Sequence, residues 1–207
     1  MMRITLTNIA KHFNKEVVFT GVDHVLEAGS RTAVLGPNGS GKSTLLHVVA
    51  GALIPTAGTV AHTREGAPID PEAVYRHVSI AAPYLNLYEE LTLRETIANH
   101  LRFKPLRNGI GTDEAARIAY LEAHLGKPVR NFSSGMKQRL KLALAILSDT
   151  PLLLLDEPTS NLDAEAVAWY RALLSEHLAA RTLVVASNRL EAEYDRCTEA
   201  IEIGRYK

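Results

Sequence analysis

The feature that most constrains this chain is a glycine-rich segment, residues 36–44, which reads Gly-Pro-Asn-Gly-Ser-Gly-Lys-Ser-Thr. An apolar run precedes it at residues 31–36 and another follows at 45–50, so we expect it to join a buried strand to a helix. Its glycines allow the backbone to curl until successive N–H groups point inward, at the positive end of the helix. Such a nest binds phosphate. The segment therefore predicts a phosphate-binding loop in an α/β fold.

The residue types of this loop suit a nucleoside triphosphate with Mg²⁺. Lys42 brings a full charge to the β- and γ-phosphates, and the Ser43 hydroxyl can ligate Mg²⁺. The expected nucleotide contacts are Gly36, Pro37, Asn38, Gly39, Ser40, Gly41, Lys42, Ser43 and Thr44. A glycine-rich turn with a chance lysine is the alternative, and the flanking strand and helix argue against it.

Other apolar runs place this loop in a parallel sheet. Residues 152–155 and 183–186 are apolar on both faces, which is typical of strands covered by helices on each side. The first residues of the chain alternate instead, which predicts a small antiparallel patch. We expect an α/β core with a helical block inserted into it.

The helical block is expected between about residues 85 and 147. One helix begins near residue 91, a second runs from 113 to 125 with Thr112 as its cap, and a third runs from 134 to 147. Beyond the block, Trp169 and Tyr170 are expected on a helix that packs against the sheet.

Two acids follow the apolar run at residues 152–155, where ligands gather in an open α/β sheet. Asp156 is expected to bind Mg²⁺, either directly or through one of the other ligands of the ion. Glu157 points to the opposite side of the strand, where it can polarise an attacking water. Two acids could merely cap the next segment, but beside a phosphate loop they favour a catalytic site.

Charge and composition narrow the class of protein. Lys and Arg number 23 and Asp and Glu also 23, so nothing suggests nucleic acid or an anionic surface as a partner. The single cysteine, Cys197, fits a reduced cytosolic protein. The most apolar stretch, residues 140–155, is interrupted by polar residues, whereas a spanning helix needs roughly 20 apolar ones. We expect a soluble, cytoplasmic chain that reaches a membrane only through a partner.

Two further segments carry a resemblance to a known family. Residues 131–139, Asn-Phe-Ser-Ser-Gly-Met-Lys-Gln-Arg, resemble the signature sequence of ABC ATPases, and residues 158–163, Pro-Thr-Ser-Asn-Leu-Asp, resemble their D-loop. With the phosphate loop, in this order, they extend the resemblance over essentially the whole chain. It implies one domain, 1–207, with a P-loop NTPase (RecA-like) parallel-sheet core at 1–83 and 148–207. The resemblance also implies an N-terminal antiparallel β patch and an inserted helical subdomain at about 84–147.

The resemblance implies a head-to-tail dimer that holds two ATP molecules between its subunits. The phosphate loop of one copy would face Ser133, Ser134 and Gly135 of the other, where a helix start could bind the γ-phosphate. A plain helix cap is the alternative for the two serines. Phe13 falls where the family places an aromatic that stacks on adenine, and core packing is its alternative.

Two positions depart from the family. Pro83-Tyr84 stands where a glutamine that reaches Mg²⁺ is usual, and Asn188 replaces the switch histidine. An amide can donate a hydrogen bond to the γ-phosphate but carries no proton or charge at neutral pH. We expect Glu157 and Asn188 to be the catalytic residues, with ATP binding intact and hydrolysis slower than in a member with both family residues.

The resemblance favours the ATP-hydrolysing motor subunit of an ABC transporter, peripheral on the inner face of the cell membrane. Its partners would be transmembrane permease subunits, docked on residues 84–95, and a second ATPase copy, identical or related. An ABC-type ATPase acting on nucleic acid or ribosomes is the alternative, but the chain lacks a second ATPase unit and is not basic. A small-molecule kinase would leave the signature and D-loop unexplained.

Overall fold

The computed structural model describes residues 1–207, which form two compact units. Unit 1 consists of residues 1–80, 151–157 and 180–207, and unit 2 of residues 81–150 and 158–179. Residues 158–179 therefore group with the helical block, whereas the sequence analysis assigned them to the core. The reason is that residues 164–177 of this segment lie against residues 134–147 of the helical block.

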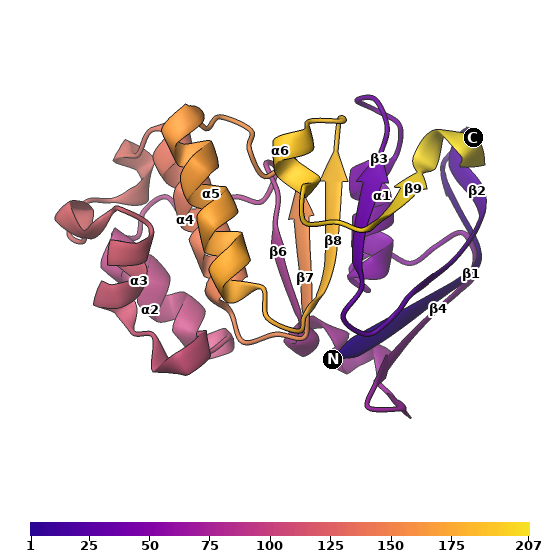
Figure 1. The fold of residues 1–207 in the computed structure, drawn as a ribbon, viewed down its shortest axis with the longest axis horizontal. Helices are drawn as coiled ribbons and strands as arrows, with labels where there is room; N and C mark the ends of the chain where they lie inside the picture. The colour runs from indigo at the N-terminus through magenta and orange to yellow at the C-terminus, as the bar shows by residue number, and fades with distance from the viewer. The chain divides into compact units, whose positions relative to one another are not determined.

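Unit 1 contains a five-stranded sheet in the order β6-β7-β8-β3-β9, drawn as arrows in Figure 1. β8 pairs in parallel with β3 and β7, and β3 also pairs in parallel with β9. The strands are β3 (Arg31–Leu35), β6 (Val78–Ala81), β7 (Leu152–Asp156), β8 (Thr182–Ser187) and β9 (Glu199–Glu202). Every residue of β7 and β8 is buried, as expected for runs that are apolar on both faces.

A second, antiparallel sheet of unit 1 has the order β2-β1-β4-β5. Its strands are β1 (Met2–Phe13), β2 (Glu16–Leu26), β4 (Ala57–Arg64) and β5 (Ala67–Pro68). The β1–β2 hairpin turns at residues 14–15, and its register sets Phe13 opposite Glu16. Side chains of β1 and β2 share a buried core with α1 (Lys42–Val49), which follows β3. The short helix α6 (Glu191–Tyr194) and the 3₁₀ turns η1 (Pro71–His77) and η5 (Ile203–Tyr206) complete this unit.

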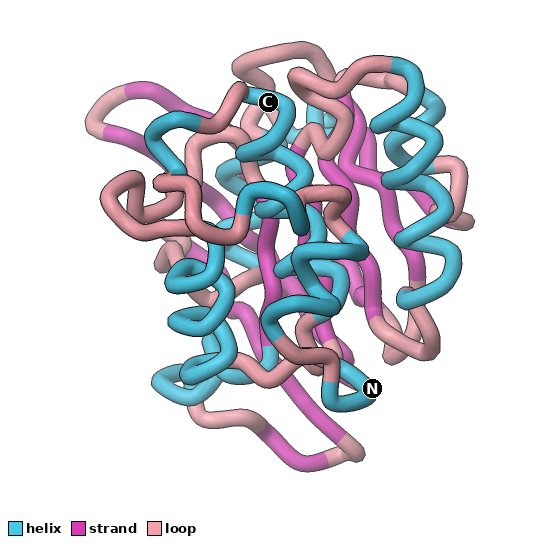
Figure 2. Tube along the Cα trace, turned by 90° about the vertical axis from the view of Figure 1, so that its left-hand side faces the viewer, coloured by secondary structure: helices cyan, strands magenta, loops and turns pink.

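Unit 2 is helical, and Figure 2 distinguishes its helices in cyan from the magenta strands. Its helices are α2 (Leu93–Phe103), α3 (Thr112–Ile118), α4 (Ser134–Leu147) and α5 (Ala164–His177). Short 3₁₀ turns link them: η2 (Arg107–Gly109), η3 (Glu122–His124) and η4 (Val129–Asn131). α2 begins with a reciprocal cap in which Thr92 and Glu95 each bond the other's backbone N–H. None of the helices combines the length and apolar character that crossing a bilayer requires.

Three local expectations need correction. α4 has the bounds expected from the sequence, but α3 ends at Ile118 instead of Leu125, because Tyr120 adopts a left-handed φ of 57° that ends the helix. Gly111, not Thr112, caps it. Trp169 does not pack as expected either: its indole Nε1 donates to the Ile118 carbonyl at 2.8 Å, so it packs within unit 2.

Candidate functional site

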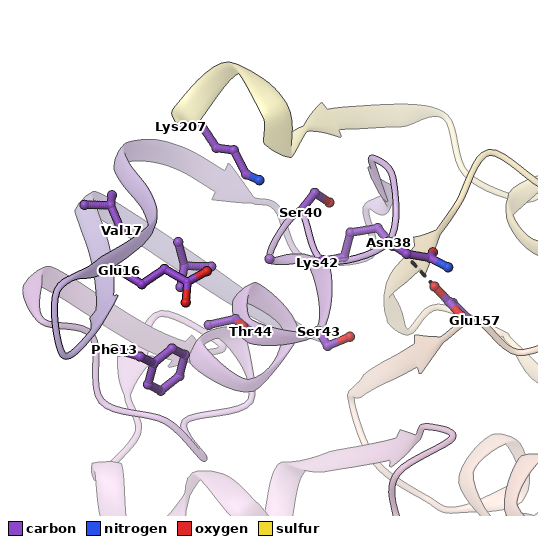
Figure 3. A pocket seen from close by; sticks show the side chains of 13 residues that line it. Phe13, Glu16, Val17, Asn38, Ser40, Lys42, Ser43, Thr44, Glu157 and Lys207 are labelled. Atoms are coloured by element: carbon purple, nitrogen blue, oxygen red, sulfur yellow. Dashed lines mark ion pairs between the residues drawn. The ribbon is translucent and has the colours of Figure 1, made fainter.

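Unit 1 contains a cavity of about 340 Å³ between the phosphate-binding loop and the β1–β2 hairpin. Its lining residues, shown in Figure 3, are Phe13, Glu16, Val17, Val18, Asn38, Gly39, Ser40, Gly41, Lys42, Ser43, Thr44, Glu157 and Lys207. Residues 38–44 of the expected nucleotide site thus line it together with Phe13 and Glu157. Gly36 and Pro37 begin the loop without lining the cavity.

The start of α1 opens into this cavity. Its first helical hydrogen bond runs from Leu45 N to Gly41 O at 2.9 Å, and no side chain caps the helix. The amides of residues 42–44 therefore have no partner within the helix, and the helix dipole adds positive potential there. The Ser40 hydroxyl is buried with its residue only 2% exposed, and it has no hydrogen-bond partner. These unsatisfied donors fit a phosphate chain.

Lys42 supplies the buried positive charge of the site, because it is only 4% exposed. Its Nζ donates to the Pro37 carbonyl at 3.1 Å and lies 3.4 Å from Glu157 Oε1, the ion pair drawn dashed in Figure 3. A buried ammonium needs such partners because its desolvation costs several kcal/mol. The lysine and the carboxylate thus hold each other at one end of the cavity.

Glu157 owes its position to an unusual backbone. Its φ is 42°, in the left-handed region that costs a non-glycine residue about 1 kcal/mol. Its N–H donates to the Ala186 carbonyl at 2.9 Å, so the ladder between β7 and β8 continues past the end of β7. This bond fixes the turn, and the side chain projects toward Lys42.

Asp156, the last residue of β7, is 1% exposed and pairs in register with Ala186 of β8. Mg²⁺ prefers oxygen ligands, which the Asp156 carboxylate and the Ser43 hydroxyl provide. The Ser43 hydroxyl on the cavity wall and the buried Asp156 carboxylate at the end of β7 supply two such oxygen ligands.

Asn188 follows β8 on an exposed turn and does not line the cavity. The turn is held from within: the Ser187 hydroxyl donates to Glu193 Oε2 at 2.5 Å and accepts from Leu190 N at 3.1 Å. Arg189 adopts a φ of 61° and bonds Glu202 at 2.6 Å. The backbone at Asn188 is therefore held in place. Asn188 lies two residues after Ala186, which pairs with Asp156 in the sheet.

Phe13 lies at the opposite end of the cavity from Glu157 (Figure 3). It is 49% exposed, which excludes the alternative that it packs in the core. The Lys11 ammonium lies 5.1 Å from the ring centroid and donates to the Ile54 carbonyl at 2.9 Å. An aromatic face held by a tethered cation is a prepared stacking surface.

The signature residues Ser133, Ser134 and Gly135 belong to unit 2 and do not line this cavity. Ser133 caps α4 by accepting from Met136 N at 3.2 Å, so the alternative reading as a helix cap holds for this serine. Ser134 stays exposed, and its amide and that of Gly135 precede the first helical bond of α4, from Lys137 N to Ser133 O.

Four cavity residues escaped the sequence analysis: Glu16, Val17, Val18 and Lys207. The hairpin register would have found Glu16, but Lys207 is remote in sequence. The sequence analysis also did not consider Lys141, which does not line the cavity. Its Nζ donates to the Ala82 and Pro83 carbonyls at 3.1 Å, in the segment that lacks the family glutamine. Burial lowers the pKa of Lys141, and nearby Lys137 lowers it further.

Comparison with known proteins agrees with this geometry. The sequence profile of the ABC transporter family matches residues 19–160. The chain belongs to this family. It is 36% identical to the cytochrome c biogenesis ATP-binding export protein CcmA of Cupriavidus pinatubonensis, over 84% of this chain and 77% of that protein. It is 32% identical to the Nod factor export ATP-binding protein I of Burkholderia lata, over 98% and 68%.

A solved structure shows the same fold. It is a dimeric ATP-binding cassette in a post-hydrolysis state with ADP and Pi, with a TM-score of 0.80 at 24% identity, over 97% of this chain and 95% of that one. The expected α/β fold, with a parallel sheet and an antiparallel patch, is thereby confirmed. As a family member, the chain is an ATP-binding, ATP-hydrolysing subunit of the ABC transporter type.

Two glycines of the phosphate loop provide a matched test of its geometry. Gly41 has a φ of 100°, and a Cβ there would lie 2.7 Å from Val18 Cγ1, whereas Gly39 has a φ of 72° with nothing within 4 Å of its Cβ position. Gly39→Ala should lower the free energy of unfolding by about 1 kcal/mol through backbone strain alone. Gly41→Ala adds a clash in the core and should cost about 2–4 kcal/mol. Urea unfolding of both variants measures this difference, and equal losses would contradict the predicted clash with Val18.

Proposed function

We propose that this ABC ATPase drives a transporter by closing and reopening a dimer around two ATP molecules. The observation that carries the proposal is the Lys42–Glu157 ion pair at 3.4 Å, set beside the open start of α1 in one cavity. A cation for phosphate and a carboxylate for water lie together there, which hydrolysis of a phosphoanhydride requires.

Binding begins with an exchange of partners. The triphosphate enters with its phosphates at the amides of residues 42–44, and the Ser40 hydroxyl gains a hydrogen bond. Lys42 then pairs with the β- and γ-phosphates, which offer more negative charge than Glu157 does. The carboxylate is released from its ion pair in the same event. ATP binding thereby prepares the base.

Ser43 and Asp156 would hold Mg²⁺ in the loaded site. Such an ion would neutralise charge on the phosphate oxygens. Lys42 and the start of α1 complement this charge from the loop. Asp156 is suited to the task because its burial keeps it in place at the end of β7.

Hydrolysis then needs a water in line with the γ-phosphate. Glu157 accepts a hydrogen bond from this water and takes its proton as the oxygen bonds to phosphorus. The bond between the γ-phosphorus and the bridging oxygen breaks, and ADP and phosphate leave. Asn188 donates its amide N–H to a γ-phosphate oxygen, in the place where the family has a histidine.

A second copy completes the site. The exposed Ser134 hydroxyl and the amides of Ser134 and Gly135 offer donors at the start of α4, which suits the γ-phosphate of an ATP bound to the other copy. The solved relative in a post-hydrolysis state is a dimer, which supports this arrangement. The second copy is either identical to this chain or a related ATPase.

Replacing Glu157 with glutamine tests the shared site. Glu157→Gln keeps the phosphate contacts but removes the base, so ATP with Mg²⁺ should convert the variant from monomer to dimer and slow hydrolysis by a factor of about 10²–10⁴. Size-exclusion chromatography with light scattering measures the mass. Glu165→Gln, an exposed carboxylate in the first turn of α5, is the matched control and should stay monomeric. A monomeric Glu157→Gln at saturating ATP would refute the sandwich.

The role of Asn188 predicts a gain of function. Asn188→His restores a group that can carry positive charge at the γ-phosphate, so kcat for ATP hydrolysis should rise, by up to about 10²-fold. KM should change little because the contact strengthens in the transition state. Steady-state phosphate release measures both constants. An unchanged or lower kcat would show that Asn188 is not the equivalent of the switch histidine.

We also propose that separate membrane-spanning permease subunits dock on unit 2, which would hold this chain at the inner face of the cell membrane. A groove of about 610 Å³ lies between the segment at residues 88–91 and α2. Tyr88 and Phe103 on it are 72% and 78% exposed, more apolar surface than a solvated loop needs. The names of the two export relatives support a membrane partner.

Docking can be tested by co-purification from native membranes. The double variant Tyr88→Asp, Phe103→Asp should lose an integral membrane partner that the wild type retains, because charge is costly in a buried apolar contact. Tyr75→Asp, at a tyrosine of unit 1 that is 60% exposed, is the control and should retain it. Recovery of ribosomal proteins or DNA in place of a membrane protein would favour the nucleic-acid alternative.

A further inference from the structure

We propose that Glu16 recognises the ribose of the bound nucleotide, so that the site selects ribonucleotides over 2′-deoxyribonucleotides. This inference rests on the nucleotide site proposed above and adds a residue that determines specificity. It starts from the cavity wall formed by the β1–β2 hairpin, opposite the phosphate loop.

The hairpin register places Glu16 beside the stacking surface. Glu16 and Phe13 are direct partners across the two strands, and the Cβ atoms of such partners are about 5 Å apart. Both side chains line the cavity. In Figure 3 the Glu16 carboxylate lies above the Phe13 ring and beside Thr44 of the phosphate loop.

This order along the cavity matches the order of groups in a nucleotide. A base stacked on Phe13 and a phosphate chain on residues 42–44 leave one group in between, which is the sugar. The Glu16 carboxylate therefore lies where the 2′- and 3′-hydroxyls pass.

The negative charge of Glu16 also favours the sugar as its binding partner. No hydrogen bond or ion pair holds its carboxylate: Lys11 is committed to Phe13 and Ile54, and Lys207, across the cavity, forms no ion pair with it. A carboxylate accepts hydrogen bonds and repels phosphate. Glu16 can therefore bind a nucleotide only through a group that donates hydrogen bonds. A vicinal diol has two O–H groups, and one carboxylate can accept a hydrogen bond from each of them.

The base is the other donor within a nucleotide, through its exocyclic amine. The exocyclic amine of adenine lies on the six-membered ring, away from the glycosidic bond, whereas the diol lies on the sugar, between the base and the phosphates. That position favours the diol. The two sources are separated by nucleotides that lack one donor at a time.

The experiment compares dissociation constants of the full-length chain by calorimetry in EDTA, where hydrolysis does not interfere. The wild type should bind ATP about tenfold more tightly than 2′-dATP, the effect of one hydrogen bond to a charged acceptor. In Glu16→Ala the two constants should become equal, through weaker binding of ATP. Purine riboside triphosphate, which lacks the amine, should bind the wild type as ATP does. Lys15→Ala, the neighbouring hairpin residue outside the cavity, is the matched control and should keep the preference.

Each contrary result has a distinct meaning. A Glu16→Ala variant that keeps the tenfold preference, or a wild type without one, overturns the proposal. A Glu16 effect that vanishes with purine riboside triphosphate, but not with 2′-dATP, assigns the carboxylate to the base and also overturns it. Undiminished ATP binding by Lys42→Ala would instead show that the nucleotide site itself is misplaced.

Discussion

A nearly buried ammonium ion is the constraint on which this site depends. Lys42 is only 4% exposed, and its ammonium donates to the Pro37 carbonyl and lies 3.4 Å from the Glu157 carboxylate, the partners that a buried charge requires. The first partner requires the tight loop that Gly41 makes possible, and the second requires β7 to end beside it. The parallel sheet thus serves to bring one lysine, one carboxylate and one helix start to the same place.

Much of this arrangement was predictable because its signals are local. The glycine spacing marked the phosphate loop, runs that are apolar on both faces marked β7 and β8, and a serine before a stripe of leucines gave the bounds of α4. Each of these signals lies within the segment that it describes. The function could be inferred as well, because the loop and the signature are short segments that carry the family resemblance.

The rest depends on contacts that no local signal encodes. Tyr120 ends α3 early by adopting a left-handed conformation, and a tyrosine in the sequence does not predict this conformation. Trp169 donates its indole N–H to the carbonyl of Ile118, 51 positions earlier, and so packs within the helical unit. Glu16 enters the cavity only because a hairpin sets it opposite Phe13. Register and long-range packing decide these cases.

The position of Glu157 in the chain has a mechanical consequence. It is the last residue of its segment of unit 1, and Pro158, the first of the next segment of unit 2, is fastened to α4 because its carbonyl accepts from Gln138 at 2.9 Å. One peptide bond and one hydrogen bond therefore connect the carboxylate that we propose as the base of hydrolysis with the helix that begins with the signature. The chain passes between the two units after residues 80, 150, 157 and 179, and only the crossing after Glu157 places the proposed base directly beside a residue held by α4.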